Sequence, residues 1–124
     1  MKQKVLVVDD SLFIRSSLIQ TLESESYEII GSVPTGEEAL EIVEQLRPQL
    51  VILDMVLPDM TGIDVLKVVK KHYPETKVVI LSTMAQQSVI VEAKAAGADR
   101  YLIKPVSEND LIEALNEIFT AGKH

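Results

Sequence analysis

The sequence contains no cysteine, and no apolar run in it approaches the roughly 20 residues of a membrane-spanning helix. Without cysteine, the chain has no disulfides, thiolate metal sites or thiol nucleophile, and it suits a reducing compartment. The Met-Lys-Gln start leads directly into a short Val/Leu segment and has no signal-peptide cleavage pattern. We therefore expect a cytoplasmic protein without a membrane segment.

Positive charge is also scarce, with 12 basic against 19 acidic residues and a formal net charge of −7. This balance opposes binding to nucleic acid or anionic lipid, so we expect neither as a direct partner. The 124 residues are 47% hydrophobic and 25% charged, which is ordinary for a globular chain. A chain of this length can bury one compact core, and we expect one domain over residues 1–124.

Short β-rich runs alternate with longer segments of helical period along the chain. The expected strands are residues 4–8, 27–33, 49–53, 77–81 and 100–103. The first, third and fourth contain continuous apolar runs, as central strands covered on both faces require, so we expect the other two at the edges. This alternation predicts an α/β fold, a doubly wound parallel sheet between two layers of helices.

Several expected helices carry start and stop signals. A hydroxyl residue followed three positions later by an acidic residue indicates a capping box. The pattern occurs at Thr35 and Glu38, at Thr61 and Asp64, and at Ser107 and Asp110. Pro48 and Gly97 are placed to end two helices.

Polar side chains follow four of the expected strands. Asp9 and Asp10 follow the first strand, Asp54 the third, Ser82 and Thr83 the fourth, and Lys104 the fifth. In an open α/β sheet, ligands bind outside the carboxyl ends of the strands. We therefore expect three carboxylates, a hydroxyl and an amine to meet at one edge of the sheet.

Three carboxylates at one edge would raise one another's pKa values unless a cation neutralised them. Mg²⁺ fits this need, because it prefers oxygen ligands and commonly bridges carboxylates to a phosphate. With the ion bound, an aspartate could attack a phosphoryl group in line, and Lys104 and Ser82 would share the charge on that group. The sequence thus favours Mg²⁺-dependent phosphoryl chemistry.

The chain resembles the receiver domains of bacterial two-component response regulators. The matching motifs are residues 7–11 (VVDDS), 53–62 (LDMVLPDMTG), 81–84 (LSTM) and 96–105 (AGADRYLIKP). They occur in the right order and spacing, and together they are far more specific than an acidic pair or a Lys-Pro dipeptide alone. The resemblance implies a flavodoxin-like (βα)5 fold with strand order 2-1-3-4-5.

The resemblance also implies roles for the acidic residues. Asp54 would be the phosphoacceptor, and Mg²⁺ would be bound by Asp10, Asp54 and the backbone carbonyl of Val56. Asp9 would act mainly through a metal-bound water. Val56 comes two residues after Asp54, and Met84 comes two residues after Ser82. Both would flank the path of the hydrolytic water.

Further implied roles concern the end of the fifth strand. Lys104 would bind the phosphoryl group, and its peptide bond to Pro105 would be cis. Ser82 would be the switch hydroxyl, and Tyr101 the aromatic residue that changes rotamer with it.

By the same resemblance, the chain would be a phosphorelay signalling protein rather than an enzyme, catalysing only its own phosphoryl transfer and slow autodephosphorylation. A phosphohistidine on a sensor histidine kinase would be the donor, and a phosphatase is a possible further partner. An output protein would bind the face formed by the fourth helix, fifth strand and fifth helix. Residues 84–87 (MAQQ) and the absence of an output domain from this sequence look most like stand-alone chemotaxis receivers. A truncated receiver of a longer regulator stays open.

Simpler roles exist for each site residue. Asp9 and Asp10 could cap a helix, Asp54 could cap a turn, and Lys104 could be an ordinary surface lysine. Tyr101 could serve only in packing. Thr83 competes with Ser82 for the switch position, which the spacing assigns to Ser82.

Three other functions would make different demands on the sequence. A dehalogenase-like phosphatase would carry Asp-x-Asp after its first strand and would need a cap domain. A flavodoxin-like cofactor binder would need a glycine- or hydroxyl-rich phosphate loop there, where Asp9 and Asp10 would repel the phosphate. A pseudo-receiver that binds partners without phosphorylation would not need the complete acidic and lysine set.

Overall fold

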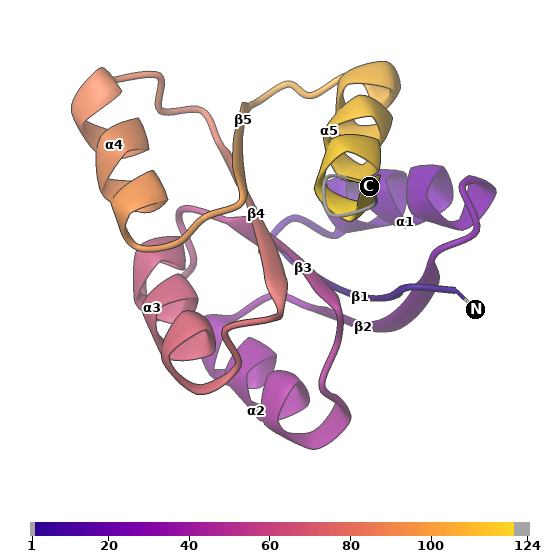
Figure 1. Ribbon diagram of the computed structural model, residues 1–124, viewed down its shortest axis with the longest axis horizontal. Helices are drawn as coiled ribbons and strands as arrows, with labels where there is room; N and C mark the ends of the chain where they lie inside the picture. Colours follow the sequence, from indigo (N-terminus) through magenta and orange to yellow (C-terminus); the bar gives the residue numbers. More distant parts are fainter. Residues whose placement is uncertain (1, 121–124) are drawn as a thin grey trace.

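A computed structural model describes residues 2–120; residue 1 and residues 121–124 of the expected domain lie outside the described residues. Strands and helices alternate along the chain as β1 Lys4–Val8, α1 Leu12–Ser24, β2 Glu28–Val33, α2 Gly36–Leu46, β3 Leu50–Asp54, α3 Gly62–His72, β4 Lys77–Ser82, α4 Gln87–Ala95, β5 Arg100–Ile103 and α5 Glu108–Thr120. The strands form one parallel sheet in the order β2-β1-β3-β4-β5 (Figure 1). The predicted order and edge strands are confirmed.

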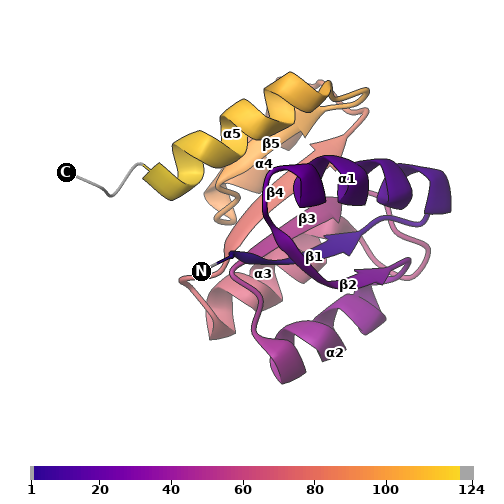
Figure 2. The same ribbon diagram turned by 90° about the vertical axis from the view of Figure 1, so that its right-hand side faces the viewer.

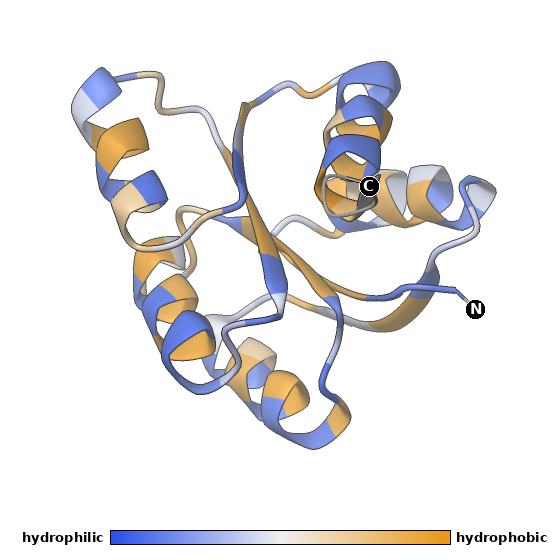
Figure 3. Ribbon diagram, in the orientation of Figure 1, coloured by the Kyte–Doolittle hydropathy of each residue, from blue (hydrophilic) through white to orange (hydrophobic). Residues whose placement is uncertain are grey.

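The sheet separates two apolar cores. Helices α1 and α5 pack on one face (Figure 2), whereas α2, α3 and α4 pack on the other (Figure 1). Successive side chains of a strand point to opposite faces, so β1, β3 and β4 supply apolar residues to both cores. In Figure 3 these central strands are hydrophobic along most of their length, as the sequence pattern required. The doubly wound three-layer sandwich is confirmed.

Two central strands extend one residue further than expected. Asp54 is the last residue of β3 and Ser82 is the last residue of β4. The backbone of Met55 donates a hydrogen bond to the Leu81 carbonyl at 3.0 Å, which continues the pairing of these strands past Asp54. Asp54 and Ser82 are therefore positioned by sheet pairing and not by a loop.

The capping signals are realised to different extents. Thr61 and Asp64 form a complete capping box at the start of α3. At α2 the capping box is incomplete. The Thr35 hydroxyl accepts a hydrogen bond from the Glu38 N–H, but the Glu38 carboxylate accepts from the Thr35 hydroxyl, at 2.9 Å. The Ser107 hydroxyl accepts from the backbone of Asp110 at 3.1 Å.

Backbone conformation at the helix ends also follows the sequence. Gly97 follows α4 with φ +110°, a value that residues with a Cβ rarely adopt, so glycine is suited to end this helix. Arg47, which precedes Pro48, ends α2 in the left-handed conformation. Over residues 2–120, we find no helix with both the length and the apolar character needed to span a bilayer.

Candidate functional site

Three carboxylates meet at the carboxyl edge of the sheet. Asp9 and Asp10 lie directly after β1, and Asp54 ends the neighbouring strand β3. One oxygen atom from each of the three side chains lies within 4.8 Å of the other two. Asp9 and Asp54 are buried and Asp10 is exposed, so the cluster opens to solvent on one side.

Lys104 supplies the positive charge between two of these carboxylates. Its Nζ lies 2.9 Å from Oδ2 of Asp9 and 3.3 Å from Oδ1 of Asp54. The backbone of Lys104 donates a hydrogen bond to the Ser82 carbonyl at 2.8 Å, which fixes the base of the side chain at the end of the sheet. The peptide bond between Lys104 and Pro105 is cis. Lys104 is thus an ion-paired residue of this site, and its reading as an ordinary surface lysine is wrong.

The charges in the site are unequal, with three carboxylates facing one ammonium. Burial raises the pKa of Asp54, and the negative charge of Asp9 raises it further; the Val56 N–H and Lys104 only partly offset this. Burial lowers the pKa of Lys104, but its hydrogen bond to Asp9 and the charge of Asp54 outweigh burial and raise it overall. Excess negative charge therefore remains after the lysine has been counted.

This excess and the ligand chemistry together fit a hard divalent cation. The site offers carboxylate oxygens on neighbouring strand ends, which are the ligands that Mg²⁺ prefers, and one side open to solvent for the waters that Mg²⁺ retains. A cation there would lower the cost of holding three carboxylates together. The residues present therefore fit Mg²⁺.

Backbone N–H groups orient the buried carboxylates. The Ser11 N–H donates to Oδ1 of Asp9 at 2.9 Å, and the Val56 N–H donates to Oδ1 of Asp54 at 3.3 Å. The residue that caps α1 is Ser11, whose side chain accepts a hydrogen bond from the backbone of Ile14. The alternative role of Asp9 and Asp10 as caps of this helix is therefore wrong.

The hydroxyl residues at the end of β4 differ in burial. Ser82 is 2% exposed, and its Oγ accepts a hydrogen bond from the Met84 N–H at 2.9 Å, whereas Thr83 is exposed. The Tyr101 hydroxyl donates to the carbonyl of the same Met84 at 2.7 Å, and Tyr101 packs against the core that includes α2, α3 and α4. Ser82 and Tyr101 thus bind the N–H and the carbonyl of the same residue, Met84.

Val56 and Met84 follow Asp54 and Ser82 by two residues, and the N–H of each donates a hydrogen bond to that residue's side chain. Val56 is 57% exposed and Met84 is 36% exposed. Both line a groove of about 580 Å³ between the β3–α3 segment and α4. Two partly exposed apolar side chains therefore line the same groove.

The sequence reasoning missed two residues that organise this edge. Arg15 donates through its guanidinium to the Asp9 carbonyl and to the Ser32 hydroxyl, which joins α1, β1 and β2. The Asp59 carboxylate accepts hydrogen bonds from the backbones of Gly36 and Glu37, both at 2.9 Å. Arg15 lies one turn after the cap of α1, a weak signal, whereas no local pattern pairs Asp59 with a helix 23 residues away.

Comparisons with known proteins agree with this geometry. The response regulator receiver domain family matches residues 5–116. The chain is 37% identical over 118 residues to the chemotaxis protein CheY of Thermotoga maritima, covering 95% of this chain and 98% of that protein.

Solved structures of receiver domains and of CheY also match this chain. A CheY-like response regulator receiver domain protein from Methanospirillum hungatei JF-1 superposes with a TM-score of 0.92 at 34% identity, covering 98% of this chain and 96% of that one. The CheX–CheY–BeF3–Mg²⁺ complex from Borrelia burgdorferi contains a chain that matches with a TM-score of 0.91 at 27% identity, covering 94% and 89%.

Proposed function

Because this chain belongs to the response regulator receiver domain family, we propose that Asp54 is its phosphoacceptor and that Mg²⁺ binds beside it. Receiver domains take phosphoryl groups from histidine kinases and act on output partners. The observation that carries the assignment is Asp54 at the end of β3, within 3.3 Å of the Lys104 ammonium and beside two further carboxylates.

The proposed reaction is transfer of a phosphoryl group to the Asp54 side chain. A carboxylate oxygen of Asp54 forms a bond to phosphorus while the bond from phosphorus to the nitrogen of a donor phosphohistidine breaks. Lys104, now paired with Asp9 and Asp54, provides an ammonium for the incoming phosphoryl oxygens. The Val56 N–H keeps the attacking carboxylate in position.

Asp10, Asp54 and the backbone carbonyl of Val56 are the proposed ligands of Mg²⁺, with Asp9 acting through a metal-bound water. When bound, Mg²⁺ supplies positive charge that neutralises the carboxylates and the phosphoryl oxygens. The exposed side chain of Asp10 and the burial of Asp9 support this division of roles.

The switch is proposed to be Ser82 with Tyr101. Both side chains bind Met84: the Ser82 hydroxyl accepts from the Met84 N–H, and the Tyr101 hydroxyl donates to the Met84 carbonyl. If the Ser82 hydroxyl turned to a phosphoryl oxygen, the Met84 N–H would lose its partner, and the segment leading into α4 would rearrange. The face formed by α4, β5 and α5 would then present a different surface to an output protein.

The remaining assignments are part of the same proposal. Residues 1–124 form one receiver domain in the cytoplasm, with a sensor histidine kinase as donor, an output protein at the face of α4, β5 and α5, and no activity besides its own phosphoryl transfer and autodephosphorylation. The resemblance to CheY proteins favours chemotaxis. The Borrelia structure, in which CheY is bound to CheX, supports a dedicated partner such as a phosphatase.

Labelling by a small phosphodonor tests the acceptor. We expect acetyl phosphate with Mg²⁺ to add one base-labile phosphoryl group to Asp54, located by mass spectrometry. Asp54→Asn should abolish the label, whereas the control Asp110→Asn, at an exposed position on α5, should keep it. Equal labelling of Asp54→Asn and the parent chain would show that the acceptor is another residue.

A further inference from the structure

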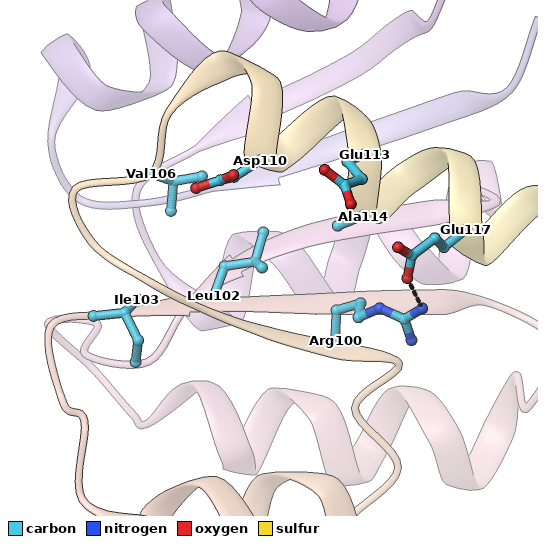
Figure 4. Close-up of a pocket in the computed structure, with 8 residues that line it drawn as sticks. All are labelled: Arg100, Leu102, Ile103, Val106, Asp110, Glu113, Ala114 and Glu117. Atoms are coloured by element: carbon cyan, nitrogen blue, oxygen red, sulfur yellow. Dashed lines mark hydrogen bonds and ion pairs between the residues drawn. The ribbon is translucent and has the colours of Figure 1, made fainter.

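A groove of about 370 Å³ runs between β5 and α5, on the face proposed for output (Figure 4). Its apolar surface comes from Leu102, Ile103, Val106 and Ala114. Ile103 is 41% exposed, although it is a large aliphatic residue, and Val106 and Leu102 are only half-buried. The groove therefore exposes apolar surface that a partner could cover.

One wall of this groove is acidic. Asp110, Glu113 and Glu117 repeat every three to four residues on α5, so they share the side of the helix that faces β5 (Figure 4). All charged residues of α5 are acidic, namely these three and Glu108. A single helix face thus combines negative charge with an apolar border.

One basic residue, Arg100, lines the groove, and its charge is already matched. Its Nη2 lies 2.7 Å from Oε2 of Glu117. Within residues 2–120, the ion pairs include neither Asp110 nor Glu113. Two carboxylates beside the apolar surface therefore have no positive partner in the described chain.

We propose that this groove binds a protein segment that carries lysine or arginine next to an apolar side chain. The apolar side chain would contact Ile103 and Val106, and the basic groups would pair with Asp110 and Glu113. This inference rests on the proposed function, because it describes the partner of the proposed output face. Charge of this kind selects partners and speeds their encounter more than it adds affinity.

Charge also argues against other occupants. A second copy of this chain would bring the same acidic wall, on a molecule with a formal net charge of −7, so two such faces repel. A phosphorylated or nucleic-acid ligand would meet the same repulsion. A basic segment is the occupant for which the wall is complementary.

The groove is adjacent in sequence to the candidate phosphoryl site. Ile103 and Val106 flank Lys104 and Pro105, and the ammonium of Lys104 contacts Asp54. The same short segment therefore forms part of the acidic site and part of the groove, which is why we assign this groove to the output face.

The test uses a synthetic 12-residue peptide with leucine and lysine at helical spacing, and the same peptide with glutamate in place of lysine. The groove variant is Asp110→Lys with Glu113→Lys. The matched control is Glu41→Lys with Glu44→Lys, two exposed residues on α2 with the same spacing. Each substitution changes the charge by two, so both variants have a formal net charge of −3 in place of −7.

We expect the lysine peptide to bind the parent chain and to shift the amide NMR signals of residues 100–117. Binding should weaken about tenfold in the groove variant, since two attractive contacts become repulsive, and less than about twofold in the control. The glutamate peptide should not bind. The neutral pair Asp110→Asn with Glu113→Gln should give an intermediate loss, which keeps the test valid if the lysine variant folds poorly.

Equal weakening in both lysine variants, or amide shifts centred away from β5 and α5, would overturn the proposal. Concentration-dependent dimerisation through this face would overturn it in favour of a second copy. The charge dependence is expected both without phosphorylation and with beryllium fluoride and Mg²⁺. Its failure is therefore separate from a failure of Asp54 labelling.

Discussion

Replacing Gly62 with alanine should damage both the fold and the acceptor, because α3 begins against the end of β3. A Cβ at this position would lie 2.5 Å from the backbone oxygen of Asp54 and 2.9 Å from Cα of Met55. Ordinary contacts of such an atom are 3.4–4 Å, so the start of α3 and the end of β3 would have to separate by nearly 1 Å. The atoms in the way are backbone atoms, which cannot rotate aside.

The size of the effect follows from two opposed contributions. Overpacking of this kind costs roughly 1–3 kcal/mol, whereas alanine gains up to about 1 kcal/mol over glycine within a helix. Gly62 is the first residue of α3, where that gain is small, and its N–H donates to the Met55 carbonyl at 2.6 Å. We therefore expect a net loss of about 1–3 kcal/mol, or a melting temperature roughly 4–12 °C lower.

The control is Gly31→Ala in β2, where the added Cβ would meet methyl groups of Ile42 and Leu6, both at 2.9 Å. These are ends of flexible side chains that can turn away, so this variant should stay within about 1 kcal/mol of the parent. Thermal unfolding and the initial rate of Asp54 labelling measure the two effects. If both alanine variants melt alike and label at the parent rate, the close approach at Gly62 does not hold the acceptor.

Other predictions test separate parts of the site. The double variant Val56→Asn with Met84→Glu should lose its phosphoryl group faster after donor removal, because polar groups can orient a water. General acid–base assistance is worth about 10²–10⁴-fold in rate. Decay at the parent rate or slower would contradict this. Mg²⁺ at 100 times its dissociation constant should stabilise the parent chain by about 2.7 kcal/mol and so raise its melting temperature. The rise should be clearly smaller for Asp10→Asn. Hydrogen bonds from the backbones of Gly36 and Glu37 hold the pKa of Asp59 below its ordinary value, so its stabilising effect is present above about pH 4 and lost as the pH falls further. The melting-temperature gap between the parent and Asp59→Asn should therefore shrink from pH 6 to pH 3, and a constant gap would refute the linkage.

Much of the fold could be predicted because it depends on local patterns. The apolar run 50–53 needs cover on both faces, which makes it a central strand, and Thr61 with Asp64 satisfies its own capping pattern within four residues. The last residue of a strand is harder to predict, because pairing with a neighbour decides it. Asp54 and Ser82 belong to β3 and β4 for that reason, although a polar residue after an apolar run looks like the start of a loop.

The sequence by itself determined which chemical groups meet, since parallel strands end at one edge, where Asp9 and Lys104 each follow a strand and Asp54 ends one. Only the tertiary structure decided how they meet. The Lys104 ammonium lies between two carboxylates that are 95 and 50 positions away in the chain, and Asp59 accepts hydrogen bonds from the start of a helix that begins 23 residues earlier. Such contacts depend on the packing of whole elements, so no local pattern encodes them. The acidic groove likewise exists only because α5 packs beside β5 and turns Asp110 and Glu113 toward exposed apolar residues.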